Sequence, residues 1–155
     1  MRTCLVTRSA ARTSGLVLAL AAAFLCLPAA PARGQVSLSL STGTVTLPTA
    51  DPDSTPVIAA PPFTLQARAN KSTWQLTVIA SGDLSSGASS IPIGNLSWTI
   101  TPNPPFRDGV MSSTVAQLMG SDTHPLNPAV NATVRYYLVN SWTYDVANYS
   151  VTLTY

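Results

Sequence analysis

The side chains that could carry out chemistry are few, and they are scattered along the chain. Histidine occurs once, at His124, two residues after Asp122 and next to a proline. A Ser-His-Asp triad needs a positioned base beside an activated serine, and the sequence contains no Gly-x-Ser-x-Gly motif. The sequence therefore predicts no catalytic triad, and we expect His124 on a surface loop.

The acidic residues are all aspartates, and most of them stand next to Gly, Pro, Ser or Asn, a pattern typical of turns. Glycoside hydrolysis needs two carboxyl groups at a defined separation, one of them often with a raised pKa. Aspartates that form turns do not indicate such a pair. We therefore predict that the protein is not an enzyme and needs no cofactor.

One loop could suit a metal ion. Asp51-Pro52-Asp53-Ser54-Thr55 places two carboxylates and two hydroxyls close together, and calcium accepts oxygen ligands of this kind. The proline stiffens the loop, however, and no glutamate is available to bind the ion through both oxygens. We interpret the two aspartates as turn formers and expect no metal.

Aromatic side chains are the best candidates for ligand contacts. Trp74 and Trp98 alternate in phase with apolar neighbours and are expected in the core. Tyr137 has the opposite phase to the apolar residues of its segment, and Trp142 and Tyr144 lie in a connection. Tyr137, Trp142 and Tyr144 therefore form a candidate exposed patch that could stack on sugars.

The first 34 residues read as a signal peptide. Arg2, Arg8 and Arg12 precede an apolar run from Gly15 to Leu27, and small residues follow it. Cleavage is expected near Ala32 to Gly34. The apolar run is shorter than the roughly 20 residues that a membrane span needs. We predict a secreted or cell-surface protein whose mature chain has no membrane span.

Removal of this leader changes the properties of the chain. Both cysteines, Cys4 and Cys26, lie in the leader, so the mature chain would have no disulfide and no thiolate metal site. Four basic residues would remain against six aspartates. Such a chain lacks the clustered Lys and Arg that nucleic-acid binding requires, and we predict no nucleic-acid partner.

The mature chain alternates apolar and polar residues in short segments separated by turn-rich loops. This pattern predicts an all-β protein, an antiparallel Ig-like β-sandwich of about seven or eight strands. The clearest segments are residues 63–70, 73–80, 95–101, 130–139 and 149–155. Residues 114–119 and the edge segment 91–93 are weaker candidates, and residues 124–128 are expected to form a loop because of their two prolines.

Three regions follow the leader. Residues 35–47 form an N-terminal strand or arm, residues 48–62 form a loop or linker with five prolines, and residues 63–155 form the body of the domain. The arm places Val36, Leu38 and Leu40 on one face. It could be the first strand of its own fold, or it could insert as a strand into another subunit.

Two sequence motifs resemble those of secreted bacterial surface proteins. Trp74-Gln75-Leu76 is similar to the first motif of WxL-type cell-wall domains, but no second such motif occurs near the C-terminus. The final segment, Tyr149 to Tyr155, resembles the last strand of pilins and spore-coat-U-like proteins. In pilins the tyrosine is usually one residue before the last, and a disulfide is common. The resemblance implies a surface β-sandwich that could assemble through an added strand.

We therefore expect a non-enzymatic structural or adhesion-type protein. Its partners would be copies of itself, other surface proteins or cell-wall polysaccharide. The assembly hypothesis depends on Val36, Leu38 and Leu40. The alternative is a carbohydrate-binding module that uses Tyr137, Trp142 and Tyr144.

Overall fold

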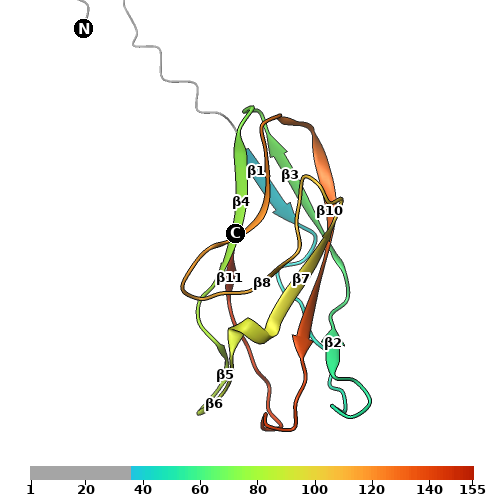
Figure 1. The fold of residues 1–155 in the computed structure, drawn as a ribbon, viewed down its shortest axis with the longest axis vertical. Helices are drawn as coiled ribbons and strands as arrows, with labels where there is room; N and C mark the ends of the chain where they lie inside the picture. The colour runs from blue at the N-terminus through green and yellow to red at the C-terminus, as the bar shows by residue number, and fades with distance from the viewer. Residues whose placement is uncertain (1–35) are drawn as a thin grey trace, which may run out of the picture. The chain divides into compact units, whose positions relative to one another are not determined.

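The computed structural model describes residues 36–155, and Figure 1 shows their course. The predicted signal peptide, residues 1–34, lies outside this range. In the described part the elements are β-strands and one 3-10 turn, η1 (Ile93–Asn95). No helix that could cross a membrane occurs in residues 36–155.

The larger sheet has six strands in the order β1-β3-β10-β7-β8, with β2 beside β10. All of its neighbouring strands are antiparallel. Its strands are β1 (Val36–Leu40), β2 (Val57–Ala59), β3 (Phe63–Ala69), β7 (Leu96–Thr101), β8 (Gly109–Val110) and β10 (Leu126–Val139).

The smaller sheet has three antiparallel strands in the order β11-β4-β9. They are β4 (Trp74–Ala80), β9 (Gln117–Asp122) and β11 (Leu153–Thr154). A separate hairpin follows β4 and pairs β5 (Leu84–Ser86) with β6 (Ser89–Ile91). Its turn contains Gly87 at a φ of 59°, a conformation that glycine adopts without steric cost. The prediction of an all-β protein with antiparallel sheets is confirmed.

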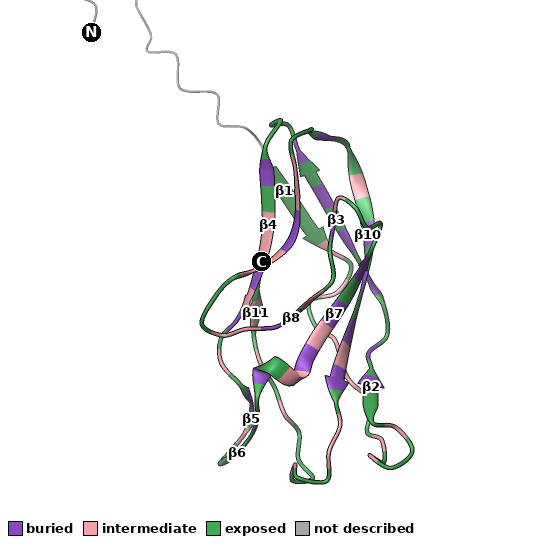
Figure 2. Cartoon of the chain, in the orientation of Figure 1, coloured by how far each residue is buried: buried purple, intermediate pink, exposed green. Residues whose placement is uncertain are grey.

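Buried side chains from both sheets form one hydrophobic cluster. Along β3 buried and exposed residues alternate strictly, and the second half of β10 has the same alternation except that Tyr137 is half-buried (Figure 2). Each strand therefore turns one apolar face inward. Leu65 and Val134 of the larger sheet belong to the same cluster as Val78 and Met119 of the smaller one. Trp74 and Trp98 are also buried in this cluster, as their phase predicts.

Backbone hydrogen bonds join the two sheets along one side. The segment between β7 and β8 reaches β9, where the Arg107 N–H donates to the Met119 carbonyl (2.8 Å). The Ser121 N–H donates to the Pro105 carbonyl (3.2 Å), and Phe106 forms a bridge with Gly120. We call this the closed side of the domain.

Prolines caused two errors in the strand prediction. The predicted loop or linker, residues 48–62, contains β2, which ends before Pro61 and Pro62. The predicted loop at residues 124–128 contains the start of β10, which passes through Pro128. The pairing of β10 with β3 shifts register between Leu126 and Val130, so Pro128 lies where no ladder donor is needed.

Other segments differ in extent. The predicted strand at residues 114–119 begins at Gln117 and continues to Asp122, and Ile93 starts η1 instead of extending an edge strand. The last predicted strand, residues 149–155, is regular only at Leu153 and Thr154, with an isolated bridge from Ser150 to Ser85. It lies at the edge of a sheet, where only one neighbour holds it.

The closed side gives the first testable prediction. A Cβ atom at Gly120 would lie 2.7 Å from the Phe106 ring and 3.3 Å from the Pro105 carbonyl oxygen. Gly120→Ala should therefore reduce the free energy of unfolding by about 1–3 kcal/mol, measured by urea denaturation. Gly82→Ala is the matched control, because a Cβ there would meet nothing within 4 Å. Equal stability of the two variants would contradict this packing.

Candidate functional site

The side opposite the closed one contains a large groove. It has a volume of about 910 Å³. It lies between the segment that follows β1, residues 42–50, and the C-terminal segment, residues 149–155. We call these segments the first and the second rim. The apolar side chains that line the groove include Val45, Leu47, Ile58, Phe63, Leu84, Ile91, Leu96, Leu138, Val151 and Leu153.

The first rim is extended but unpaired. Val45 and Leu47 alternate with exposed threonines and pack partly against the core. Between Val45 and Thr49, no backbone N–H of this described segment donates a hydrogen bond to another part of residues 36–155. The rim therefore has the side-chain pattern of a strand but lacks a neighbouring strand.

The second rim is paired along one edge only. Ser150 exchanges backbone hydrogen bonds with Ser85, and the Thr152 carbonyl accepts from the Ser81 N–H (2.9 Å). In an antiparallel ladder alternate residues bond to the same neighbour. The backbone groups of Val151 and Leu153 therefore point away from β4, toward the groove. β11 is the outermost strand of its sheet, so this edge is open.

Tyr136 and Tyr155 connect the second rim to the floor of the groove. Their hydroxyl groups form a hydrogen bond with each other across the two sheets. Burial is the main cause that raises the pKa of both hydroxyls, and the neighbouring Tyr155 raises the pKa of Tyr136 further. The Tyr136 ring also stacks on Phe63, with ring centroids 5.7 Å apart. The C-terminal residue is thus fixed to the larger sheet.

The predicted arm forms β1 at the edge of the larger sheet. It pairs with β3 in the register Val36 to Ala69, Leu38 to Ala67 and Leu40 to Leu65. The arm side chains therefore share the inward face of the sheet. Val36 is 64% exposed and Leu38 is 36% exposed, so no other part of residues 36–155 covers these two side chains fully.

The three aromatic candidates do not form one patch. Trp142 and Tyr144 line the groove, whereas Tyr137 lies on the opposite, outer face of β10. Trp142 is 68% exposed, and its indole N–H donates to an Asp53 carboxylate oxygen (2.9 Å). Tyr144 packs against the core and accepts a hydrogen bond from the Asn95 side chain (2.5 Å).

Each aspartate accepts hydrogen bonds that shape loops. Asp83 and Asp108 accept from the backbone N–H groups of Ile93 and Ile100, each at 2.8 Å. Asp51 accepts from the Asp53 N–H, and Asp53 accepts from the Trp142 indole N–H. Asp122 accepts from Thr123 and His124, and Asp145 accepts from the Ser89 hydroxyl. In residues 36–155 no three His, Cys, Asp or Glu side chains gather as metal ligands would.

The only histidine lies on the surface, as its position in the sequence predicts. The His124 side chain is 83% exposed and its Nδ1 lies 3.0 Å from an Asp122 oxygen. The hydrogen bond to His124 is the main cause that lowers the pKa of Asp122. No serine hydroxyl is hydrogen-bonded to this pair in the described part of the chain.

Sequence reasoning missed the groove itself. Two signals bear on it: Gly43 interrupts the alternation after β1, and Val45 and Leu47 resume it on the other phase. These signals indicate a bend. They do not show that the bend leaves two strand-like segments facing each other, because that depends on distant pairings.

Comparison of the chain with protein-family models, with characterised proteins and with solved structures gave no match.

The tyrosine pair predicts a specific response to alkaline pH. The pKa of each hydroxyl is higher in the folded protein than the value of about 10 in an unfolded chain. Stability should therefore be intact below about pH 10 and should fall above it, by up to about 1.4 kcal/mol per pH unit for each tyrosine. Urea denaturation at a series of pH values measures this slope.

Tyr136→Phe should weaken the protein at neutral pH but should reduce the alkaline slope, because one buried hydroxyl is gone. Tyr137→Phe, on the outer face, is the matched control and should keep the slope of the wild type. An unchanged slope in Tyr136→Phe would refute the role of the pair.

Proposed function

We propose that this protein is a non-enzymatic structural or adhesion-type subunit that accepts an additional β-strand in the groove. The observation that supports this most directly is the pair of rims, because each presents unpaired backbone groups to a groove lined by apolar side chains. An added strand would supply backbone hydrogen bonds to both rims and alternate apolar side chains to the floor.

The fold that this proposal implies is an Ig-like β-sandwich that is incomplete on one side. The two sheets contribute to one core and are joined along the closed side. The added strand would lie between the rims and complete the second sheet beside β11. Secretion by the N-terminal leader and exposure at the cell surface belong to the same proposal.

The donor in this proposal is the arm of a second copy of the chain. Val36, Leu38 and Leu40 alternate on one face, which is the pattern that the groove requires. In the single chain Val36 is 64% exposed and Leu38 is 36% exposed. Transfer of the arm into a neighbouring groove would bury the exposed part of these side chains and would exchange the pairing of β1 with its own β3 for pairing with the two rims.

The contact would join different surfaces of the two copies. The arm of one subunit would enter the groove of the next. After one such contact the donor would still have a free groove, and the acceptor would still have a free arm. Contacts of this head-to-tail kind produce rings or open chains instead of closed dimers.

Substitution of one arm residue tests this function. Leu38→Asp places a charge on the inserting face of β1, where the side chain is already 36% exposed, so the domain should still fold. The wild-type chain from residue 35 should form a concentration-dependent series of oligomers in analytical ultracentrifugation. Leu38→Asp should remain a monomer.

Ser37→Asp is the matched control, since it adds the same charge to the outward face of β1. A synthetic peptide of residues 35–41 should bind to the Leu38→Asp monomer and change the fluorescence of Trp142, which lines the groove. If the wild type stays monomeric, or if both aspartates abolish assembly equally, the arm is not the donor.

A further inference from the structure

The outer face of the larger sheet is a continuous polar surface. The residues of β1, β3, β7 and β10 that alternate with the core residues all point to this face, and nearly all of them are exposed. Most of them are hydroxyl or amide side chains, and Val139 at the end of β10 is an exposed apolar exception. The members are Ser37, Ser39, Thr64, Gln66, Arg68, Ser97, Thr99, Thr101, Asn131, Thr133, Arg135 and Tyr137.

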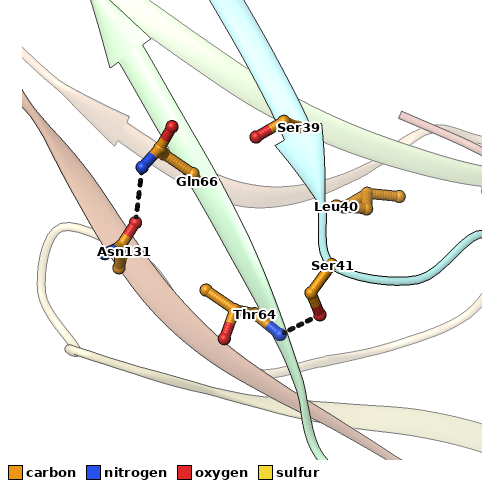
Figure 3. Close-up of a pocket in the computed structure, with 6 residues that line it drawn as sticks. All are labelled: Ser39, Leu40, Ser41, Thr64, Gln66 and Asn131. Atoms are coloured by element: carbon orange, nitrogen blue, oxygen red, sulfur yellow. Dashed lines mark hydrogen bonds between the residues drawn. The ribbon is translucent and has the colours of Figure 1, made fainter.

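A hollow of about 300 Å³ lies on this face (Figure 3). The Gln66 side-chain N–H donates to the side-chain Oδ1 of Asn131 (2.9 Å), and the Ser41 hydroxyl accepts from the Thr64 backbone N–H (2.9 Å). The first bond holds the two amides side by side. Each amide still has donors or acceptors available, because a primary amide has two N–H groups and one carbonyl. The hollow therefore presents both the hydrogen-bond donors and the acceptors that sugar hydroxyls need.

Charge is distributed unevenly over the domain. Arg68 and Arg135 lie on the outer face, and none of the six aspartates lies in β1, β3, β7 or β10. The only ion pair within residues 36–155 is that of His124 with Asp122. The two guanidinium groups are therefore not neutralised by a carboxylate of the same face, and they favour an anionic ligand.

The two arginines lie on opposite sides of the hollow. Arg68 is two residues from Gln66 along β3, and Arg135 is four residues from Asn131 along β10. Gln66 and Asn131 are register partners in antiparallel strands. The two arginine positions are therefore six residues apart along the strands. At a rise of about 3.4 Å per residue this is about 20 Å, and the hollow lies between them. A single sugar ring does not span this distance, but a linear chain of sugars does.

We propose that this outer face binds a linear acidic polysaccharide whose sugars carry carboxylate groups. The chain of sugars runs along β3 and β10. One sugar lies in the hollow and bonds to Gln66 and Asn131, and Arg68 and Arg135 bind carboxylates on either side through paired N–H groups. Tyr137 follows Arg135 on the same face of β10 and is half-buried, and its ring is the candidate contact for a further sugar.

This site is separate from the groove. The groove is lined by the two rims and by inward side chains of the larger sheet, whereas the sugar chain contacts outward side chains. Leu40 alone borders both the groove and the hollow. A subunit that donates its arm would lose Ser39 to Ser41 from the hollow but would keep the amides and arginines of β3 and β10. The proposal does not depend on strand addition, and the monomeric Leu38→Asp protein can be used to test it.

The test is a calorimetric titration of the chain from residue 35 with oligogalacturonate, and with a neutral malto-oligosaccharide of the same length. The wild type should bind oligogalacturonate at least about tenfold more tightly than the neutral sugar, because two charge-assisted contacts are lost with the latter. Arg68→Gln with Arg135→Gln should reduce the affinity for oligogalacturonate by at least about tenfold.

Lys71→Gln with Arg107→Gln is the matched control. It removes the same net charge from exposed positions outside these strands and should change the affinity less than about twofold. Gln66→Ala should weaken binding without any change of charge. Equal losses in the two double variants, equal binding of both sugars, or no binding by the wild type would each overturn the proposal. Circular dichroism of each variant establishes that the sheet is intact.

Discussion

Backbone hydrogen bonding between the edges of the two sheets is the constraint on which the rest of the structure depends. A β-sheet edge presents N–H and C=O groups that need partners, and a protein must pair them, cover them or leave them available to another chain. On the closed side the segment at Pro105 to Arg107 supplies those partners to β9. On the other side the two rims face each other across the groove without bonding. This asymmetry is the basis of the proposed addition of a strand on the open side.

Local features of the sequence keep the groove open. Pro48, in the first rim, has no backbone N–H. The loop that follows this rim is held by Asn140, whose side chain donates to the carbonyls of Ala50 and Thr55. The second rim is held by the hydroxyl pair of Tyr136 and Tyr155. Each rim is therefore held by contacts at the ends or floor of the groove, and these contacts would limit the loss of conformational entropy in the proposed strand addition.

The alternation of apolar and polar residues in the sequence predicted the strands that have a neighbouring strand on both sides. β3, β4 and β7 match their predicted segments to within one residue, and Trp98 is buried as its phase requires. Alternation fails where pairing is irregular. β2 forms within the proline-rich stretch because only three residues are needed to pair with the end of β10. Pro128 fits into β10 because the pairing with β3 shifts register there. The groove and the hollow were not predictable, since each depends on which distant segments lie next to each other.

Amide hydrogen exchange, followed residue by residue, tests the central claim most directly. In the monomeric Leu38→Asp protein the amides of Val45, Leu47, Val151 and Leu153 should exchange rapidly, because no backbone partner holds them. Addition of the peptide of residues 35–41 should protect these amides and leave those of β9, on the closed side, unchanged. Protection of the four amides before the peptide is added, or no change after it, would contradict the account of an open groove that accepts a strand.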